Sequence, residues 1–307
     1  MQKPSWMKIG TRGSPLALAQ AHQVRDALAR AHGVAPDDIE IVVIRTTGDM
    51  IQDRALSEAG GKGLFTKELD IAMIDGRIDI AVHSSKDLPT VLPPEIGIGG
   101  YTAREDVRDV FIGRDNMRLR DLPVGARVGT ASLRRGAMVK RLRPDIEIGL
   151  LRGNVQSRLG KVQSGEVDGT LLALAGLKRL GLTQHATEIL DEQAFLPAVG
   201  QGAIGITLRI ADDTTQERIA AICDRHTGIA LDVERAFLRV LDGSCRTPIA
   251  GLARVSGDDV KFRGMILRKD GSQSFDIEGG ASALEAEKLG EDCGRELLSR
   301  APSDIFA

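Results

Sequence analysis

Aromatic residues are few in this sequence, and neither sign of charge dominates. The 307 residues include seven Phe, one Tyr and one Trp, and the formal net charge is −2. Proteins that bind nucleic acids usually present a basic surface and aromatic side chains on which bases stack. We therefore expect no nucleic acid among the partners of this chain.

Cysteines and long apolar runs are also scarce. Cys223, Cys245 and Cys293 lie far apart, without a C-x-x-C pair or a nearby Cys/His cluster. This spacing disfavours a disulfide framework and a structural zinc site, so we expect free thiols and no metal. No apolar run approaches the roughly 18 residues of a membrane span, and the first residues lack the apolar core of a signal peptide. We expect a cytoplasmic protein with no membrane partner.

The residues that are abundant indicate a globular protein that binds anions. Hydrophobic residues make up 42% of the chain, enough for a sizeable core, and a length of 307 residues exceeds the commonest single-domain size, which predicts two or three domains. Arginine outnumbers lysine, 30 to 11. Because a guanidinium group binds carboxylates with two parallel hydrogen bonds, the positions of the arginines matter more than their number.

Two charged segments follow predicted strands in the first third of the chain. A short strand near Ile9 leads into a helix capped by Ser14, which places Arg12 at a helix N-terminus, where backbone N–H groups favour anions. A buried strand, Ile78–Val82, then ends in a polar cluster that contains Asp87. Ligands of open α/β sheets bind beyond such strand ends. The alternatives are a solvated Arg12 and an Asp87 that only caps a turn.

A second α/β unit follows a charged linker, Tyr101–Asp109. A strand around Val128 leads into a helix capped by Ser132, and Arg134 and Arg135 lie in the first turn of that helix. Cations at this end oppose the helix dipole, so we expect an anion to be bound there. Strands at Ile146–Leu151 and Asp168–Gly176 repeat the layout, again with arginines near the junctions.

A glycine-rich segment in the first third of the chain, Gly60–Gly63, could be mistaken for a phosphate loop. It contains Lys62, but no Ser or Thr follows the lysine and the spacing is wrong. We therefore do not expect nucleotide binding.

The last third of the chain predicts a small α+β domain. A glycine-rich crossing, Phe195–Ile206, could return the chain to its first domain, and helices are expected between Thr214 and Leu241. Alternating residues in Val260–Met265 and Ser274–Ile277 predict antiparallel strands, and a helix from Ala281 to Arg300 ends the domain.

One of the three cysteines lies in a loop. Cys245 occupies a Gly/Ser turn closed by Pro248, where a scaffold can present a reactive group, although a free cysteine is more often a small buried side chain. Cys223 and Cys293 lie in predicted helices, and we expect structural roles for both.

Eight segments, taken together, resemble the porphobilinogen deaminase family, also called the hydroxymethylbilane synthases. They occur in the family's order, from about Ile9 to the C-terminal helix. The segments are TRGSPLALAQ, GGKGLFTKEL, AVHSSKDLPT, GTASLRR, LRGNVQSRL, LAGLKRLG, PAVGQGAIGI and ERAFLRVLDGSCRTP.

The resemblance implies an α/β fold of three domains. Two periplasmic-binding-protein-like (type II) α/β domains are expected, the first discontinuous (1–102 and 202–220) and the second at 108–197. A small α+β domain at 224–307 would carry the cofactor cysteine. The family are transferases of haem and porphyrin biosynthesis. They condense four porphobilinogen molecules head to tail on a covalent dipyrromethane primer, release ammonia, and then free hydroxymethylbilane by hydrolysis. The family suggests a monomer.

The resemblance also assigns roles to individual residues. The thioether to dipyrromethane falls on Cys245, and the catalytic carboxylate on Asp87. The cofactor-binding residues would be Ser84, Lys86, Asp87, Thr130, Ser132, Arg134, Arg135 and Arg152. The substrate-binding residues would be Arg12, Ser14, Lys62, Phe65, Arg152, Arg158, Arg179 and Gln201. The sequence departs from the commonest family pattern at Ser85, Ala131, Ser244 and Arg246.

The alternative from another class is an anion-binding module without catalysis, because the same two-lobed architecture serves solute receptors. Such a receptor needs neither Asp87 nor Cys245. A scaffolding role has less support, since no repeat, coiled coil or low-complexity tract is present.

Overall fold

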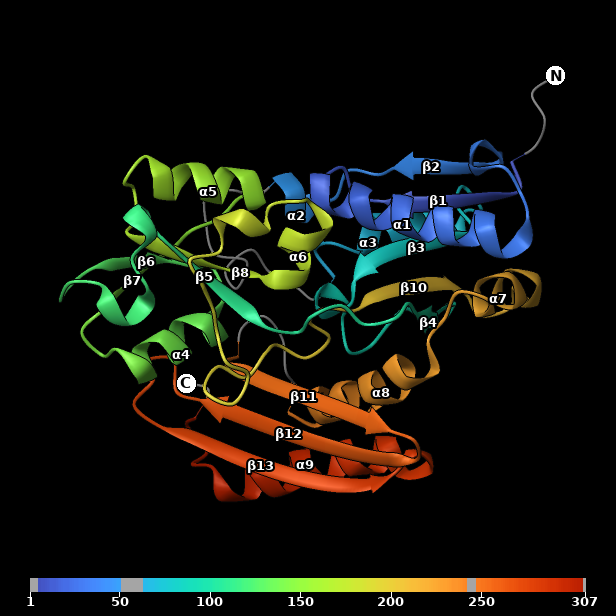
Figure 1. Ribbon diagram of the computed structural model, residues 1–307. Helices are drawn as coiled ribbons and strands as arrows, with labels where there is room; N and C mark the ends of the chain where they lie inside the picture. The colour runs from blue at the N-terminus through green and yellow to red at the C-terminus, as the bar shows by residue number, and fades with distance from the viewer. Residues whose placement is uncertain (1–4, 51–62, 242–246, 306–307) are drawn as a thin grey trace. The chain divides into compact units, whose positions relative to one another are not determined.

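The computed structural model describes all residues except 1–4, 51–62, 242–246 and 306–307 (Figure 1). The contacts between residues divide the chain into two compact units. The described parts of the first unit are 5–50, 63–105 and 203–228, and those of the second are 106–202, 229–241 and 247–305.

The first unit is built on a five-stranded mixed sheet. Its strands, in spatial order, are β2 (Ile39–Val43), β1 (Met7–Thr11), β3 (Ile80–Ser84), β10 (Ile204–Arg209) and β4 (Ile96–Tyr101). β1 pairs in parallel with β2 and β3, whereas β10 runs antiparallel to both β3 and β4. In the sequence, β10 comes after all the strands of the second sheet, so the chain leaves the first domain and later returns to it. The first domain is therefore discontinuous, as predicted.

The described residues of this unit form the helices α1 (Pro15–His32), α2 (Thr47–Met50), α3 (Lys67–Ile74) and α7 (Asp213–Ala220). The start of α1 is determined locally, since Pro15 occupies the first turn and the Ser14 hydroxyl accepts a hydrogen bond from Ala17 N over 3.3 Å. One apolar face of α1 then packs on the sheet through Ala21, Val24 and Leu28.

The second unit contains a sheet of closely similar layout. Its strands, in spatial order, are β7 (Glu147–Gly149), β6 (Arg127–Gly129), β8 (Gly169–Ala173), β5 (Asp109–Gly113) and β9 (Glu188–Ile189). β6 is parallel to β7 and β8, and β5 is antiparallel to β8 and β9. The helices of this sheet are α4 (Leu133–Leu142), α5 (Val155–Gln163) and α6 (Leu174–Arg179).

The C-terminal part is a three-stranded antiparallel meander with a helix packed along it (Figure 1). Its elements are β11 (Ile249–Ser256), β12 (Asp259–Leu267), β13 (Ser274–Ser282) and α9 (Ala286–Arg300), preceded by α8 (Arg225–Val240). Phe237 of α8 and Phe262 of β12 meet edge to face, with ring centroids 4.8 Å apart. Six short 3-10 helices complete the described elements: Pro36–Asp38, Ser85–Asp87, Arg114–Asn116, Leu119–Asp121, Thr183–His185 and Ala283–Glu285.

One hydrophobic core joins the second sheet to the C-terminal meander. Phe111 of β5 and Met138 of α4 belong to the same buried cluster as Leu252 of β11 and Met265 of β12. The fold class is therefore the predicted one: two α/β domains, the first discontinuous, with a small α+β domain at the C-terminus. The residue boundaries proposed above for the three domains stay a prediction.

Candidate active site

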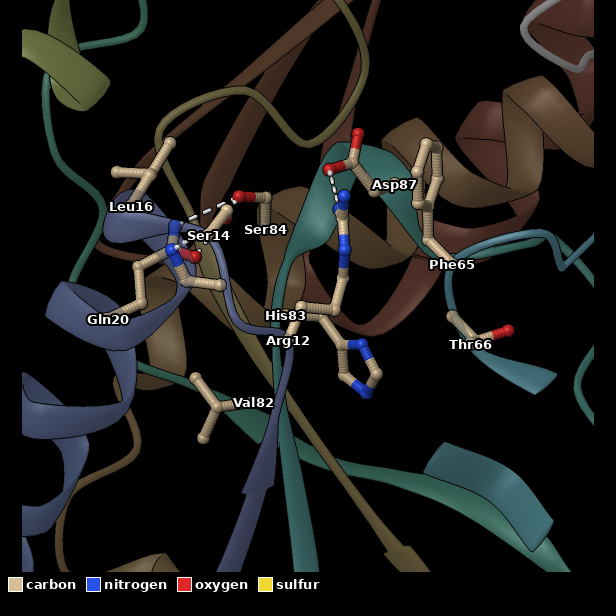
Figure 2. Close-up of a pocket in the computed structure, with 11 residues that line it drawn as sticks. Arg12, Ser14, Leu16, Gln20, Phe65, Thr66, Val82, His83, Ser84 and Asp87 are labelled. Atoms are coloured by element: carbon tan, nitrogen blue, oxygen red, sulfur yellow. Dashed lines mark hydrogen bonds and ion pairs between the residues drawn. The ribbon is translucent and has the colours of Figure 1, made fainter. Parts of the chain in front are cut away.

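Asp87 and Arg12 lie close together at one edge of the first sheet. β1 and β3 are parallel neighbours, with Ile9 opposite Ile80, so their carboxyl ends share this edge. Arg12 directly follows β1, and Asp87 ends the 3-10 turn after β3. Arg12 Nη1 is 4.0 Å from Asp87 Oδ2 (Figure 2). The Asp87 side chain is 36% exposed, so solvent or a ligand can reach this carboxylate.

Phe65 supports the same guanidinium from a second direction. The Cζ atom of Arg12 is 4.0 Å from the centroid of the Phe65 ring, a cation–π distance. Figure 2 shows the Arg12 side chain extending toward Asp87 beside the Phe65 ring. The three side chains therefore form one group, of which all three members were predicted from the family.

A small pocket of about 70 Å³ is lined by these groups. Ser14, Gln20 and Ser84 form a polar wall, in which Gln20 Nε2 donates to Ser84 Oγ over 2.9 Å. Leu16 and Val82 supply apolar surface. Lys86, one of the predicted cofactor-binding residues, is half-buried in the same 3-10 turn as Asp87.

His83 is a pocket residue that the sequence-based assignment did not include. It is 5% exposed, and its Nε2 lies 3.0 Å from Thr207 Oγ1. Burial, together with the nearby charge of Arg12, lowers the pKa of His83 to about 4. The ring is neutral at pH 7. Its position in the cluster that ends β3 was the only sequence signal for it.

Arg134 and Arg135, in the second unit, are buried at the start of α4. Their exposed fractions are 4% and 6%, and both pair with the fully buried carboxylate of Asp109 on β5. Desolvation is the main cause that lowers the pKa of Arg134, while Asp109 opposes it. The helix-dipole argument predicted an anion at this position, and the structure has one there, the carboxylate of Asp109. A role of the two arginines toward the cofactor stays a prediction.

Sequence reasoning missed Asp109, because the charged linker predicted at Tyr101–Asp109 includes it. The signal that could have found it is the apolar segment Val110–Ile112 directly after the aspartate. Such a run is typical of a short buried strand.

Thr130 and Ser132 shape the turn before α4. Ser132 N donates to Thr130 Oγ1 over 3.1 Å, and the Ser132 hydroxyl accepts from Arg135 N over 3.3 Å. Both hydroxyls thus stabilise the loop that leads into the helix.

Of the remaining predicted arginines in the second unit, Arg152 and Arg158 lie near the junction of β7 and α5, and Arg179 is the last residue of α6. Arg152 is half-buried after β7, and Arg158 Nε donates to Gly153 O over 2.9 Å. Arg179 Nη2 donates to Gly202 O over 2.7 Å. Gln201 is fully buried, and its amide donates to Val107 O over 2.8 Å. These hydrogen bonds are all to backbone carbonyl groups, and the assigned binding roles stay predictions.

Two predicted site residues, Cys245 and Lys62, lie outside the described residues, as do Ser244 and Arg246. Within the part of the chain that is described, no group of three or more His, Cys, Asp and Glu side chains could hold a metal ion. The described helices include none that is both long and apolar enough to cross a membrane.

Fold and site together define an α/β protein of two similar sheets, with Arg12 and the accessible Asp87 at the carboxyl ends of neighbouring strands of the first sheet. Two family models match the chain: the dipyromethane cofactor binding domain of porphobilinogen deaminase over residues 7–217, and the C-terminal domain of porphobilinogen deaminase over residues 229–299. The chain belongs to the porphobilinogen deaminase family, which makes it a transferase of tetrapyrrole biosynthesis that uses a dipyrromethane cofactor.

Similar curated proteins agree with this family. The porphobilinogen deaminases of Nitrobacter winogradskyi and Nitrobacter hamburgensis are each 57% identical over 298 residues, which covers 97% of this chain and 94% of theirs. Among solved structures, a YaeC-family lipoprotein from Enterococcus faecalis V583 matches with a TM-score of 0.42 and 13% identity, over 72% of this chain and 92% of that one.

Proposed function

We propose that this protein adds porphobilinogen units head to tail to a dipyrromethane held by Cys245, with Asp87 as the catalytic carboxylate. The observation that supports this most directly is the group formed by Asp87, Arg12 and Phe65 beside the pocket. A cation for a substrate carboxylate, an aromatic face for a pyrrole ring and an accessible carboxylate meet there.

The donor set fits the cofactor. A dipyrromethane carries two acetate and two propionate groups, so it needs several cationic or hydroxyl donors. Around the start of α4, two arginines share a single carboxylate, which leaves an excess positive charge at a helix N-terminus. Arg134, Arg135, Thr130 and Ser132 would hold carboxylates there. When bound, the dipyrromethane would supply the pyrrole α-carbon to which the first unit is joined, and each later unit would be joined to the α-carbon of the unit before it.

The residues of the first unit would handle the incoming porphobilinogen. Arg12, with Ser14 at the start of α1, would bind a substrate carboxylate. Loss of ammonia breaks a C–N bond of porphobilinogen and leaves a cation delocalised over its ring. Asp87 would stabilise this charge at the ring N–H and assist removal of the α-proton that leaves when the new C–C bond forms.

The other two cysteines are poor candidates for covalent attachment. Burial raises the pKa of Cys293 to about 11 and also raises the pKa of Cys223. Both thiols are therefore protonated at neutral pH, and the thiolate is the reactive form. This supports Cys245 as the residue that holds the cofactor.

Intact-mass measurement of the purified protein tests the proposal. We expect the added mass of one dipyrromethane on the wild-type protein and on Cys223→Ser and Cys293→Ser, and no added mass on Cys245→Ser. An unmodified wild-type protein that still produces hydroxymethylbilane would overturn the attachment. A protein that binds porphobilinogen without releasing ammonia would be a binding module instead.

A monomeric state, a cytoplasmic location and the absence of a nucleic-acid partner are also part of the proposal. The formal net charge of −2 supports the last of these. Light scattering coupled to size exclusion checks the first, with a mass near 32.9 kDa expected.

A further inference from the structure

A fully buried carboxylate on β5 divides its two oxygens between the two arginines of α4. Arg135 donates from Nε and Nη2 to Asp109 Oδ1 over 3.0 and 2.7 Å. Arg134 donates from Nη2 to Asp109 Oδ2 over 2.7 Å. Since each oxygen holds one guanidinium, Asp109 determines the orientation of both planes.

Each guanidinium has a second anchor on the backbone. Arg135 Nη1 donates to Leu171 O over 2.9 Å, and Arg134 Nη1 donates to Leu196 O over 2.8 Å. In contrast, Arg134 Nε is buried and has no hydrogen-bond partner among the described residues. A buried donor without a partner is unfavourable, because it has lost its hydrogen bonds to water. The cluster is therefore ordered, but one of its N–H groups is not satisfied by the protein.

Stability alone does not account for this arrangement. Buried ion pairs and triads can often be replaced by apolar side chains without loss of stability, because desolvation offsets their attraction. Here two cations share one carboxylate, and both lie in the first turn of α4, where the helix dipole is also unfavourable to them. A purely structural cluster would be expected to balance its charge.

We propose that Asp109 is a positioning residue that orients Arg134 and Arg135 toward the carboxylates of the dipyrromethane. This inference rests on the proposed function, because it gives the arginines a ligand that the reaction requires. Asp109 contacts both guanidinium groups, and the proposed effect acts through them.

Two substitutions of Asp109 test the inference. Asp109→Asn removes the charge at constant size, and Asp109→Glu keeps the charge but moves it by one methylene. Each variant is made as apo-protein in cells that produce no porphobilinogen. The apo-protein is then incubated with porphobilinogen, and the rate at which its mass increases is measured. The kcat and KM of the loaded protein are measured afterwards. We expect cofactor loading to slow by about tenfold or more in both variants, since a displacement of about 1 Å can reduce rates a hundredfold.

A control comes from the other end of the same helix. Arg143 pairs with Asp145 over 2.5 Å just beyond the C-terminus of α4. Asp145→Asn removes a more exposed arginine–aspartate ion pair of the same helix without touching Arg134 or Arg135, so it is expected to change thermal stability while cofactor loading stays within twofold of wild type.

The outcomes separate this inference from the proposed function. A folded Asp109→Asn protein that loads and turns over within twofold of wild type would overturn the positioning role. If Asp109→Asn does not fold, the loading rate of Asp109→Glu is the deciding measurement. An Asp109→Glu protein that loads cofactor at the wild-type rate, or that also fails to fold, would make Asp109 purely structural. No mass gain on the wild-type protein would overturn the proposed function itself.

Discussion

Arg12 and Asp87, which follow different strands, are brought to 4.0 Å of each other at the edge of the first sheet. The parallel pairing of β1 with β3 sets this distance, because it aligns the carboxyl ends of the two strands. Side-chain exposures of 21% and 36% show that neither charge is sealed in the interior. A partly exposed pair at this distance contributes at most about 1 kcal/mol to stability, so stability alone does not explain it.

Asp87→Asn is expected to fold normally, acquire its dipyrromethane and lose nearly all turnover. The amide keeps the size of the carboxylate but cannot balance a positive charge or accept a proton, and such groups contribute about 10²- to 10⁴-fold to rate. Single-turnover measurement of ammonia release checks this. Asp75→Asn, at an exposed aspartate at the end of α3, is the matched control, and equal kinetics of the two variants would move the catalytic role away from Asp87.

Arg12→Leu is expected to raise KM for porphobilinogen by about tenfold or more with a smaller effect on kcat, because a charge-assisted hydrogen bond to a substrate carboxylate is lost. Arg12→Lys should recover only part of the loss, since an ammonium cannot bind a carboxylate with two parallel bonds. Steady-state kinetics at fixed ionic strength measures both. The control is Arg77→Leu, because Arg77 is exposed and pairs only weakly with Asp75. A KM in Arg12→Leu equal to that of the control would leave Arg12 without a binding role.

Local signals made the Arg12 and Asp87 sites predictable. The Ser14 cap and Pro15 mark the start of α1 in the sequence, and the apolar run before His83 marks β3. The strand end and the helix start were therefore recognisable without knowledge of tertiary contacts.

Long-range partners were not predictable in the same way. The strand predicted at Asp168–Gly176 ends at Ala173, and α6 begins at Leu174. The first turn of α6 is buried on all sides, at Leu174, Ala175, Gly176 and Leu177. Its residues therefore form an apolar run without periodicity, which does not distinguish a buried strand from a buried helix. The pairing of Asp109 with Arg134 and Arg135 joins β5 to α4, and no local pattern encodes that contact.

The neutral His83 ring should make the first unit lose stability in acid. The pKa of His83 is about 4 in the folded protein, whereas its ordinary value, which applies to the unfolded chain, is 6.5. As the pH falls, the unfolded chain therefore binds the extra proton before the folded protein does. The stability that depends on the neutral ring is fully present above pH 6.5. As the pH falls from 6.5 to about 4, the free energy of unfolding decreases by about 1.4 kcal/mol per pH unit.

Urea unfolding of the wild-type protein and His83→Gln between pH 4 and 7 measures this slope. Trp6 is the only tryptophan and lies in the first unit, so its fluorescence follows the unit that contains His83. We expect the stability of the wild-type protein to fall more steeply with acid than that of His83→Gln. Parallel curves would show that His83 does not stay neutral in the folded protein.

A close approach of two helices in the C-terminal part gives the last prediction. A Cβ atom at Gly290 of α9 would come within 2.1 Å of Val233 O and 2.9 Å of Ala236 Cβ on α8. Gly290→Ala is therefore expected to destabilise the protein by about 1–3 kcal/mol, because backbone has to move. Gly160 in α5 has nothing within 4 Å of such an atom, so Gly160→Ala should stabilise by about 0.5–1 kcal/mol through its helix preference. Thermal unfolding followed by far-UV circular dichroism compares the two, and a Gly290→Ala protein at least as stable as the wild type would mean that α8 and α9 are not packed this closely.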